Sequence, residues 1–296
     1  MQLAELTWPA VDALSRDTPV VFPVAAVEQH GHHLPVFTDS LLLGEIARRA
    51  AAALGDRVLW APLMWLGNSH HHLDFPGTLS APPRTYLDLL GGLIENFIHH
   101  GFRRLVLLNG HGGNDVPGRQ AVFELRQRHR ERRDLLLLFA TYWSLGSRPW
   151  EAGVMRPETP PAKLDASIPS SSAPRDRNPL PSGGKGAGGE GEQAQGVSTF
   201  GQRQMGHACE WETSMILRLN PAAVGNLDSL GTVEFGNPFE PASRGWITKD
   251  RTVPGHIGSP QLATAAKGEV LFRAFADDVV RLLERVIRWD GSSWNG

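Results

Sequence analysis

The chain has 296 residues, with 29 Lys or Arg against 31 Asp or Glu, so its formal net charge is −2. This length suffices for one large α/β domain, and the near-neutral charge predicts neither a nucleic-acid partner nor an anionic membrane surface. No apolar run approaches the roughly 20 residues of a membrane span, and the N-terminus does not resemble a signal peptide. Cys209 is the only cysteine. Since no intrachain disulfide can form, we expect a cytoplasmic protein.

Apolar runs and helical patterns alternate along the chain. The four apolar runs predict buried strands, because they are short and hardly alternate with polar residues; they cover residues 19–25, 57–63, 104–108 and 134–142. The helical patterns cover residues 39–54, 83–100, 114–132 and 260–288, and the first has Thr38 or Asp39 as its expected N-cap. The alternation predicts a layered α/β fold with a largely parallel sheet, which binds ligands at the carboxyl ends of its strands.

Residues 157–196 differ in composition from the rest of the chain. Of these 40 residues, 19 are Pro, Gly or Ser, and none is aromatic. Such a segment cannot bury enough apolar surface to offset its ordering entropy. We predict a disordered insertion within a single domain over residues 1–296, because candidate site residues lie on both sides of it.

The segment after the first predicted strand, residues 27–40, reads VEQHGHHLPVFTDS. Glu28 and His30 are two residues apart and therefore point to the same side of an extended chain. Asp39 follows at the start of the first helix. Carboxylates and imidazoles at the end of a strand are typical ligands of a divalent metal. His32 and His33 are expected to support these ligands or to line the pocket.

Two further polar clusters are NGHGGN at residues 109–114 and HACEWETS at residues 207–214. His111 lies in a glycine-rich turn, which could alternatively cradle a phosphate. The chain has neither the G-x-G-x-x-G spacing nor a P-loop lysine, so we favour a metal ligand. The three clusters together predict one metal-dependent hydrolase site.

The motifs VEQHGHHLP…TDS, LVLLNGHGGN, DFPGTLS and HACEWETSMIL resemble those of the creatininase family, the creatinine amidohydrolases. The resemblance runs from about residue 6 to residue 288. It implies a three-layer α/β/α sandwich with two divalent metal ions that cleaves C–N bonds of cyclic or linear amides. It also implies a homo-oligomer, commonly a hexamer, that acts on a small-molecule amide.

The resemblance assigns Glu28 and His111 to one metal, His30 to the other, and Asp39 as the bridge between them. Creatininases proper carry a glutamate two residues after the histidine that matches His111, where this chain has Gly113. We infer that Glu210 replaces that carboxylate, because three carboxylates and one hydroxide would neutralise two divalent ions. The alternative is that Glu210 merely stabilises the start of a helix.

The remaining site residues follow from the same motifs. Glu212 matches a family glutamate and is predicted to hydrogen-bond to a ligand or to His207. His207 matches a mobile histidine and would protonate the leaving nitrogen after a hydroxide bridging the metals has attacked the carbonyl. Trp143 matches a tryptophan that packs on the substrate, although it could instead be a core residue. The other predicted site residues are His72 and Arg203 for substrate binding, and His32 and Asn109 in support of the ligands.

Arg203 stands where creatininases have a second substrate-packing tryptophan, which predicts an anionic or extended substrate. Other branches of the family hydrolyse formamides or trim a peptide, and they share the His-Gly-Gly-Asn form found at His111. Creatinine is therefore one candidate among several, and Zn, Mn or Fe suits the ligands. The competing hypothesis is a non-catalytic metal-binding scaffold of the same fold. Cys209 is expected to fill space rather than to act as a ligand or a nucleophile.

Overall fold

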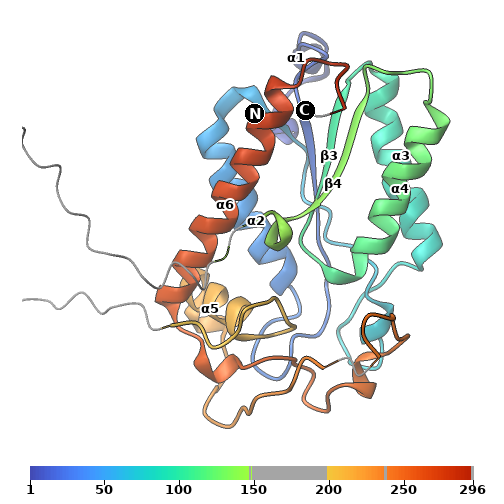
Figure 1. Cartoon of the computed structure of the whole chain (residues 1–296). Coiled ribbons are helices and arrows are strands. Elements are labelled where there is room, and N and C mark those ends of the chain that lie inside the picture. Colours follow the sequence, from blue (N-terminus) through green and yellow to red (C-terminus); the bar gives the residue numbers. More distant parts are fainter. Residues whose placement is uncertain (147, 149–198, 237–238, 295–296) are drawn as a thin grey trace, which may run out of the picture.

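A computed structural model describes residues 1–146, 148, 199–236 and 239–294 of the chain (Figure 1). Its centre is a parallel four-stranded sheet with the strand order β2-β1-β3-β4. The strands are β1 (Val20–Val24), β2 (Leu59–Trp60), β3 (Arg104–Asn109) and β4 (Leu136–Thr141). All four predicted strands are present. Strand β2 lies at the edge of the sheet and is short.

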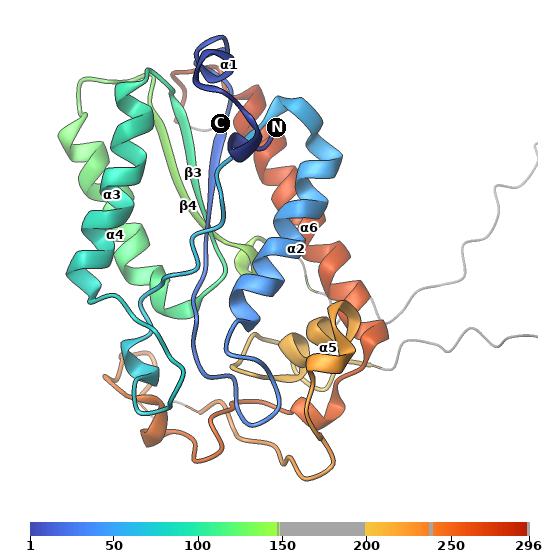
Figure 2. The ribbon, with the colours of Figure 1, turned by 180° about the vertical axis from the view of Figure 1, so that it is seen from behind.

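Helices cover both faces of the sheet and complete a three-layer α/β/α sandwich, as predicted (Figures 1 and 2). One face packs against α2 (Thr38–Leu54), α5 (Glu210–Leu219) and α6 (Ala265–Arg288). The other face packs against α3 (Pro83–His99) and α4 (Asp115–Arg128), while the short α1 (Trp8–Asp12) precedes β1. Successive β1 side chains enter opposite cores: Val21 joins the first, whereas Val20 and Phe22 join the second.

The helix ends differ in part from the expected ones. Helix α4 ends at Arg128, and α6 begins at Ala265 after Thr264, whose side chain accepts a hydrogen bond from the Lys267 N–H. The N-cap expected at Thr38 or Asp39 is wrong, because helix α2 begins at Thr38 without a side-chain cap. The Thr38 hydroxyl instead donates to the Pro35 carbonyl at 2.7 Å.

The predicted disordered insertion, 157–196, lies outside the described residues. The chain on either side of it contributes to one core, since Tyr142 and Cys209 belong to the same hydrophobic cluster. Among the residues that the structure describes, none of the helices combines the length and the apolar character of a membrane span.

Candidate metal centre

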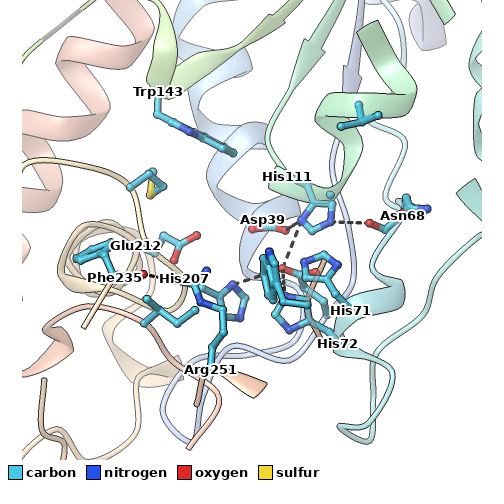
Figure 3. A pocket seen from close by; sticks show the side chains of 18 of the residues that line it. Asp39, Asn68, His71, His72, His111, Trp143, His207, Glu212, Phe235 and Arg251 are labelled. Atoms are coloured by element: carbon cyan, nitrogen blue, oxygen red, sulfur yellow. Dashed lines mark hydrogen bonds and ion pairs between the residues drawn. The ribbon is translucent and has the colours of Figure 1, made fainter. Parts of the chain in front are cut away.

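Four acidic and imidazole side chains meet beyond the carboxyl ends of β1 and β3. Two of them, Asp39 and His111, are labelled in Figure 3. His111 Nδ1 lies 2.9 Å from Asp39 Oδ2 and 3.3 Å from Glu28 Oε1. His30 Nε2 lies 3.2 Å from Asp39 Oδ1. All four residues are at least 95% buried. The structure thus brings together the four side chains that the motifs at residues 27–40 and 109–114 singled out.

Backbone carbonyls orient the two imidazoles of this cluster. His30 Nδ1 lies 3.1 Å from the Glu28 carbonyl and His111 Nε2 lies 3.0 Å from the Asn68 carbonyl. A ring nitrogen facing a carbonyl must carry the proton, so in the neutral rings His30 Nε2 and His111 Nδ1 present their lone pairs to the carboxylates. Asn109 fixes the His111 backbone, because its side chain donates to the His111 carbonyl at 2.7 Å and accepts from the His111 N–H at 3.1 Å.

The cluster has the unpaired polar atoms that a cation would satisfy. Glu28 Oε2, His30 Nε2 and Asp39 Oδ2 are buried, and none has a hydrogen-bond partner among the described residues. Although His30 and His111 are within ion-pair distance of Asp39, these contacts are not aligned as hydrogen bonds. Buried polar atoms without partners are rare in native proteins and are often explained by an ion. The donor set of carboxylate oxygens and imidazole nitrogens therefore fits divalent metals.

The electrostatics of the cluster reflect its excess of carboxylates. Burial disfavours the charged form of His111, but Glu28 and Asp39 outweigh burial and raise its pKa to about 10. In the same way, Asp39 and Glu212 raise the pKa of His30 well above its ordinary value against the effect of burial. Burial favours the protonated form of Asp39, yet His30 and His111 lower its pKa below the ordinary value. Without metal, protons on the two imidazoles therefore compensate the carboxylates.

The prediction that Glu210 supplies the missing carboxylate is wrong. Its carboxylate accepts hydrogen bonds from the backbone of Gly201 at 2.9 Å and Gln202 at 3.0 Å, and it pairs with Lys267 Nζ at 2.6 Å. Glu212 faces the cluster instead, with Oε1 3.6 Å from His30 Nε2. Two residues on a helix differ by about 200° in direction, so the two carboxylates point to opposite sides of α5.

Three more histidines border the cluster. His72 Nε2 and His207 Nδ1 each lie 3.5 Å from Glu28 Oε1. Sequence reasoning missed His71, which could share an ion with Glu28 and His111. The run His70-His71-His72 before DFPGTLS was the available signal. Burial lowers the pKa of His207 to about 3 and that of His71 to about 4, and it also lowers the pKa of His72, so all three rings are neutral at pH 7.

The cluster opens into a cavity of about 670 Å³, which Trp143, His72, His207 and Glu212 help to line (Figure 3). Arg203 is exposed and does not line this cavity, so the structure does not support its predicted contact with substrate. Arginines of a later segment, Arg244 and Arg251, line the cavity instead.

The structure places the neighbouring residues His32 and His33 in different environments. His32 is exposed and supports no ligand of the cluster, whereas the neighbouring His33 is buried, with Nε2 2.9 Å from Thr213 Oγ1. Cys209 is fully buried, and burial raises the pKa of its thiol to about 12, as expected of a residue that fills space.

The sequence matches the family model for creatinine amidohydrolase over residues 4–283. The chain belongs to the creatininase family. This creatininase-family protein is 31% identical to creatinine amidohydrolase of Pseudomonas putida over 166 residues, which cover 53% of this chain and 63% of the relative. It is 27% identical to mycofactocin precursor peptide peptidase of Mycobacterium tuberculosis (strain H37Rv), over 93% of this chain and 87% of the relative.

The creatininase-family fold is shared with solved structures. A creatininase variant complexed with creatine superposes with a TM-score of 0.70 at 24% identity, covering 97% of this chain and 99% of the other. The chain spans less than two thirds of the Pseudomonas putida enzyme, and 30% of a Thermotoga maritima 3-dehydro-scyllo-inosose hydrolase to which it is 35% identical over 94 residues.

Proposed function

We propose that this protein is a metal-dependent amidohydrolase that uses two divalent ions to hydrolyse a C–N bond of a cyclic or linear amide. The observation that carries the proposal is the convergence of Glu28, His30, Asp39 and His111, all buried, with unpaired carboxylate and imidazole atoms at one end of an open cavity. A non-catalytic scaffold would not require the neutral histidines that surround this cluster.

The two carboxylate oxygens of Asp39 suggest how the residues divide between the ions. Oδ2 is the closer oxygen to His111 and Oδ1 the closer to His30. We assign Glu28 and His111 to one ion, His30 and Glu212 to the other, and Asp39 to both. Ions in these positions would supply an activated water and would polarise the substrate carbonyl. Zinc, manganese and iron all suit this donor set, and solved creatininases include forms named for zinc and for manganese.

His207 is the residue that we propose to move the proton. Its Nε2 lies 2.7 Å from the Gln29 carbonyl and therefore carries the ring proton, which leaves the lone pair of Nδ1 facing Glu28. Because burial keeps the ring neutral, Nδ1 can accept a proton from water and return it to the leaving nitrogen.

The substrate belongs to one of two classes. A non-peptide amide is suggested by the Pseudomonas putida relative, whose name gives creatinine as the substrate. A peptide is suggested by the mycobacterial peptidases, which match this chain over nearly its whole length. We favour the linear amide, because a cavity of about 670 Å³ is within the range of drug-sized ligands and exceeds the needs of a small lactam. A homo-oligomeric assembly and a cytoplasmic location stay predictions.

Metal-loaded wild-type protein and Glu28→Gln should be assayed on creatinine, a formamidopyrimidine and short peptides, with metal content measured in parallel. Glu124→Gln, which changes an exposed carboxylate on α4, is the matched control. Glu28→Gln should lose metal and more than 100-fold in activity, since even residues that only support ligands contribute 10- to 100-fold. Metal content and turnover that survive this change would refute the ligand assignment. A wild-type protein that binds metal but turns over none of these amides would favour the scaffold.

A further inference from the structure

The cavity has two walls of opposite character. One wall holds the carboxylates and histidines of the metal centre, while the other holds Arg244 and Arg251 with the rings of Phe235 and Trp246. In Figure 3, Arg251 and Phe235 lie beyond His207, and Trp143 lies on a different side of the histidines. The metal ions would neutralise the first wall, so the second wall would give the occupied cavity its positive charge.

Arg251 is held beside the metal centre by Trp246 and by the backbone of Phe235. Its guanidinium lies 4.8 Å from the centre of the Trp246 ring and donates to the Phe235 carbonyl. Trp246 in turn meets His71 edge to face, with 5.1 Å between the ring centres. The Trp246 ring therefore contacts both this guanidinium and a histidine that borders the metal centre.

Arg251 is partly buried without a counter-charge. Among the residues that the structure describes, no Asp or Glu forms an ion pair with Arg251 or with Arg244. Burial lowers the pKa of Arg251, and no neighbouring carboxylate offsets this effect. Desolvating a cation is unfavourable unless it is paired, and the remaining N–H groups of the guanidinium suit the two oxygens of a carboxylate.

We propose, on the basis of the hydrolase function above, that the substrate carries a carboxylate that Arg251 binds while the amide to be cleaved lies at the metal centre. Arg244, exposed at the cavity mouth, adds positive charge that attracts the same group. The substrate class is a linear amide acid. Its carboxylate is either the free C-terminus of a peptide or an acidic side chain near the scissile bond. The competing explanation is that Arg251 only fastens the loop that carries Phe235 and Trp246.

The test compares matched peptide pools on the metal-loaded protein. A mixed pool of N-acetylated tetrapeptides is prepared once with free C-termini and once as C-terminal carboxamides, and the peptides retained at equilibrium, with any fragments, are quantified by mass spectrometry. A preference of at least tenfold for acids is expected. Preference for the free C-terminus identifies a terminal carboxylate, whereas enrichment of Asp and Glu over Asn and Gln in both pools identifies a side-chain carboxylate.

Variants then assign the preference to the arginines. Arg251→Gln should abolish the preference for peptides with a carboxylate. Arg251→Lys should retain part of this preference, and Arg244→Gln should weaken it. Arg273→Gln, which removes an exposed arginine from α6, is the matched control and should retain it. Thermal unfolding shows whether Arg251→Gln folds. If it does not, comparing peptides with and without a carboxylate on the wild-type protein and on Arg244→Gln still tests whether the cavity binds a carboxylate.

Three results would overturn the proposal: retention that depends neither on the C-terminal carboxylate nor on Asp and Glu side chains, no retention of either pool, or a preference that persists in a folded Arg251→Gln protein. The last result would show that the carboxylate binds the metal ions or that the arginine serves only the loop. Failure of the hydrolase function gives a different pattern, in which acids are retained through Arg251 but no pool member is cleaved.

Discussion

Glu212 Oε1 lies 3.6 Å from His30 Nε2, inside the metal centre of this creatininase-family protein. Glu210, two residues earlier on α5, is buried on the opposite side of the helix against Lys267. One turn of α5 therefore carries two carboxylates with different roles: Glu212 can bind metal, whereas Glu210 stabilises the fold.

This separation predicts opposite effects for two matched substitutions. Glu212→Gln should lower metal content and activity with little change in the free energy of unfolding, because its backbone contact with Cys209 can be kept by an amide oxygen. Glu210→Gln should cost about 3 kcal/mol of stability, because it leaves the Lys267 charge buried and unpaired. Metal analysis and urea unfolding of the metal-free proteins distinguish the two. Loss of metal in a stable Glu210→Gln protein would contradict the assignment.

Metal binding should release protons. The pKa of His30 lies well above its ordinary value and that of His111 is about 10, so both rings are charged in the metal-free protein at pH 7. A metal ligand must be neutral, so each ion displaces a proton and the apparent affinity rises with pH until the rings are deprotonated. Calorimetric titration in two buffers of different ionisation enthalpy measures the release. Equal heats in both buffers would contradict it.

Gly113 should not tolerate a side chain. A Cβ at this position would lie 2.1 Å from the Asn68 carbonyl oxygen and 2.5 Å from His111 Nε2. Since the Asn68 carbonyl orients His111, Gly113→Ala should cost about 1–3 kcal/mol and also reduce metal content. Gly112→Ala is the matched control, because a Cβ there would meet nothing within 4 Å. The comparison is made by thermal unfolding and metal analysis. Similar behaviour of the two variants would show that the loop adapts.

Glu45 should contribute a pH-dependent increment of stability away from the site. Its hydrogen bond with Arg48, together with Arg49, lowers its pKa to about 2 against the effect of burial. The contribution is therefore complete above the ordinary pKa of about 4.5 and is lost as the pH falls through about 2. Glu45→Gln should cost about 1 kcal/mol at pH 7, because Arg48 is largely exposed and solvent screens the pair.

Urea unfolding of the wild type and of Glu45→Gln between pH 7 and pH 2 gives the comparison. The difference between the two proteins should shrink steadily toward the acid end. A difference that is constant across this range would show that the carboxylate charge is not what stabilises α2.

The sequence by itself determined the order of the four strands and of the helices α2, α3, α4 and α6, and it identified the four residues at the centre of the site. Apolar runs such as 104–108 identify strands buried on both faces, and Glu28 and His111 follow strand ends at which parallel sheets bind ligands. The strands follow from local periodicity, and the site residues from polar motifs that the sequence itself contains.

Only the tertiary structure decided which carboxylate of α5 faces the cluster and which arginines line the cavity. Periodicity shows that Glu210 and Glu212 lie on different sides of a helix, but it does not show that Lys267 lies opposite one and His30 the other. Arg251 enters the cavity from a loop without periodicity, whereas Arg203, aligned by position, is left in solvent. The reason is physical, since a side chain's partner depends on which distant segment packs against it, and that packing is a property of the whole fold.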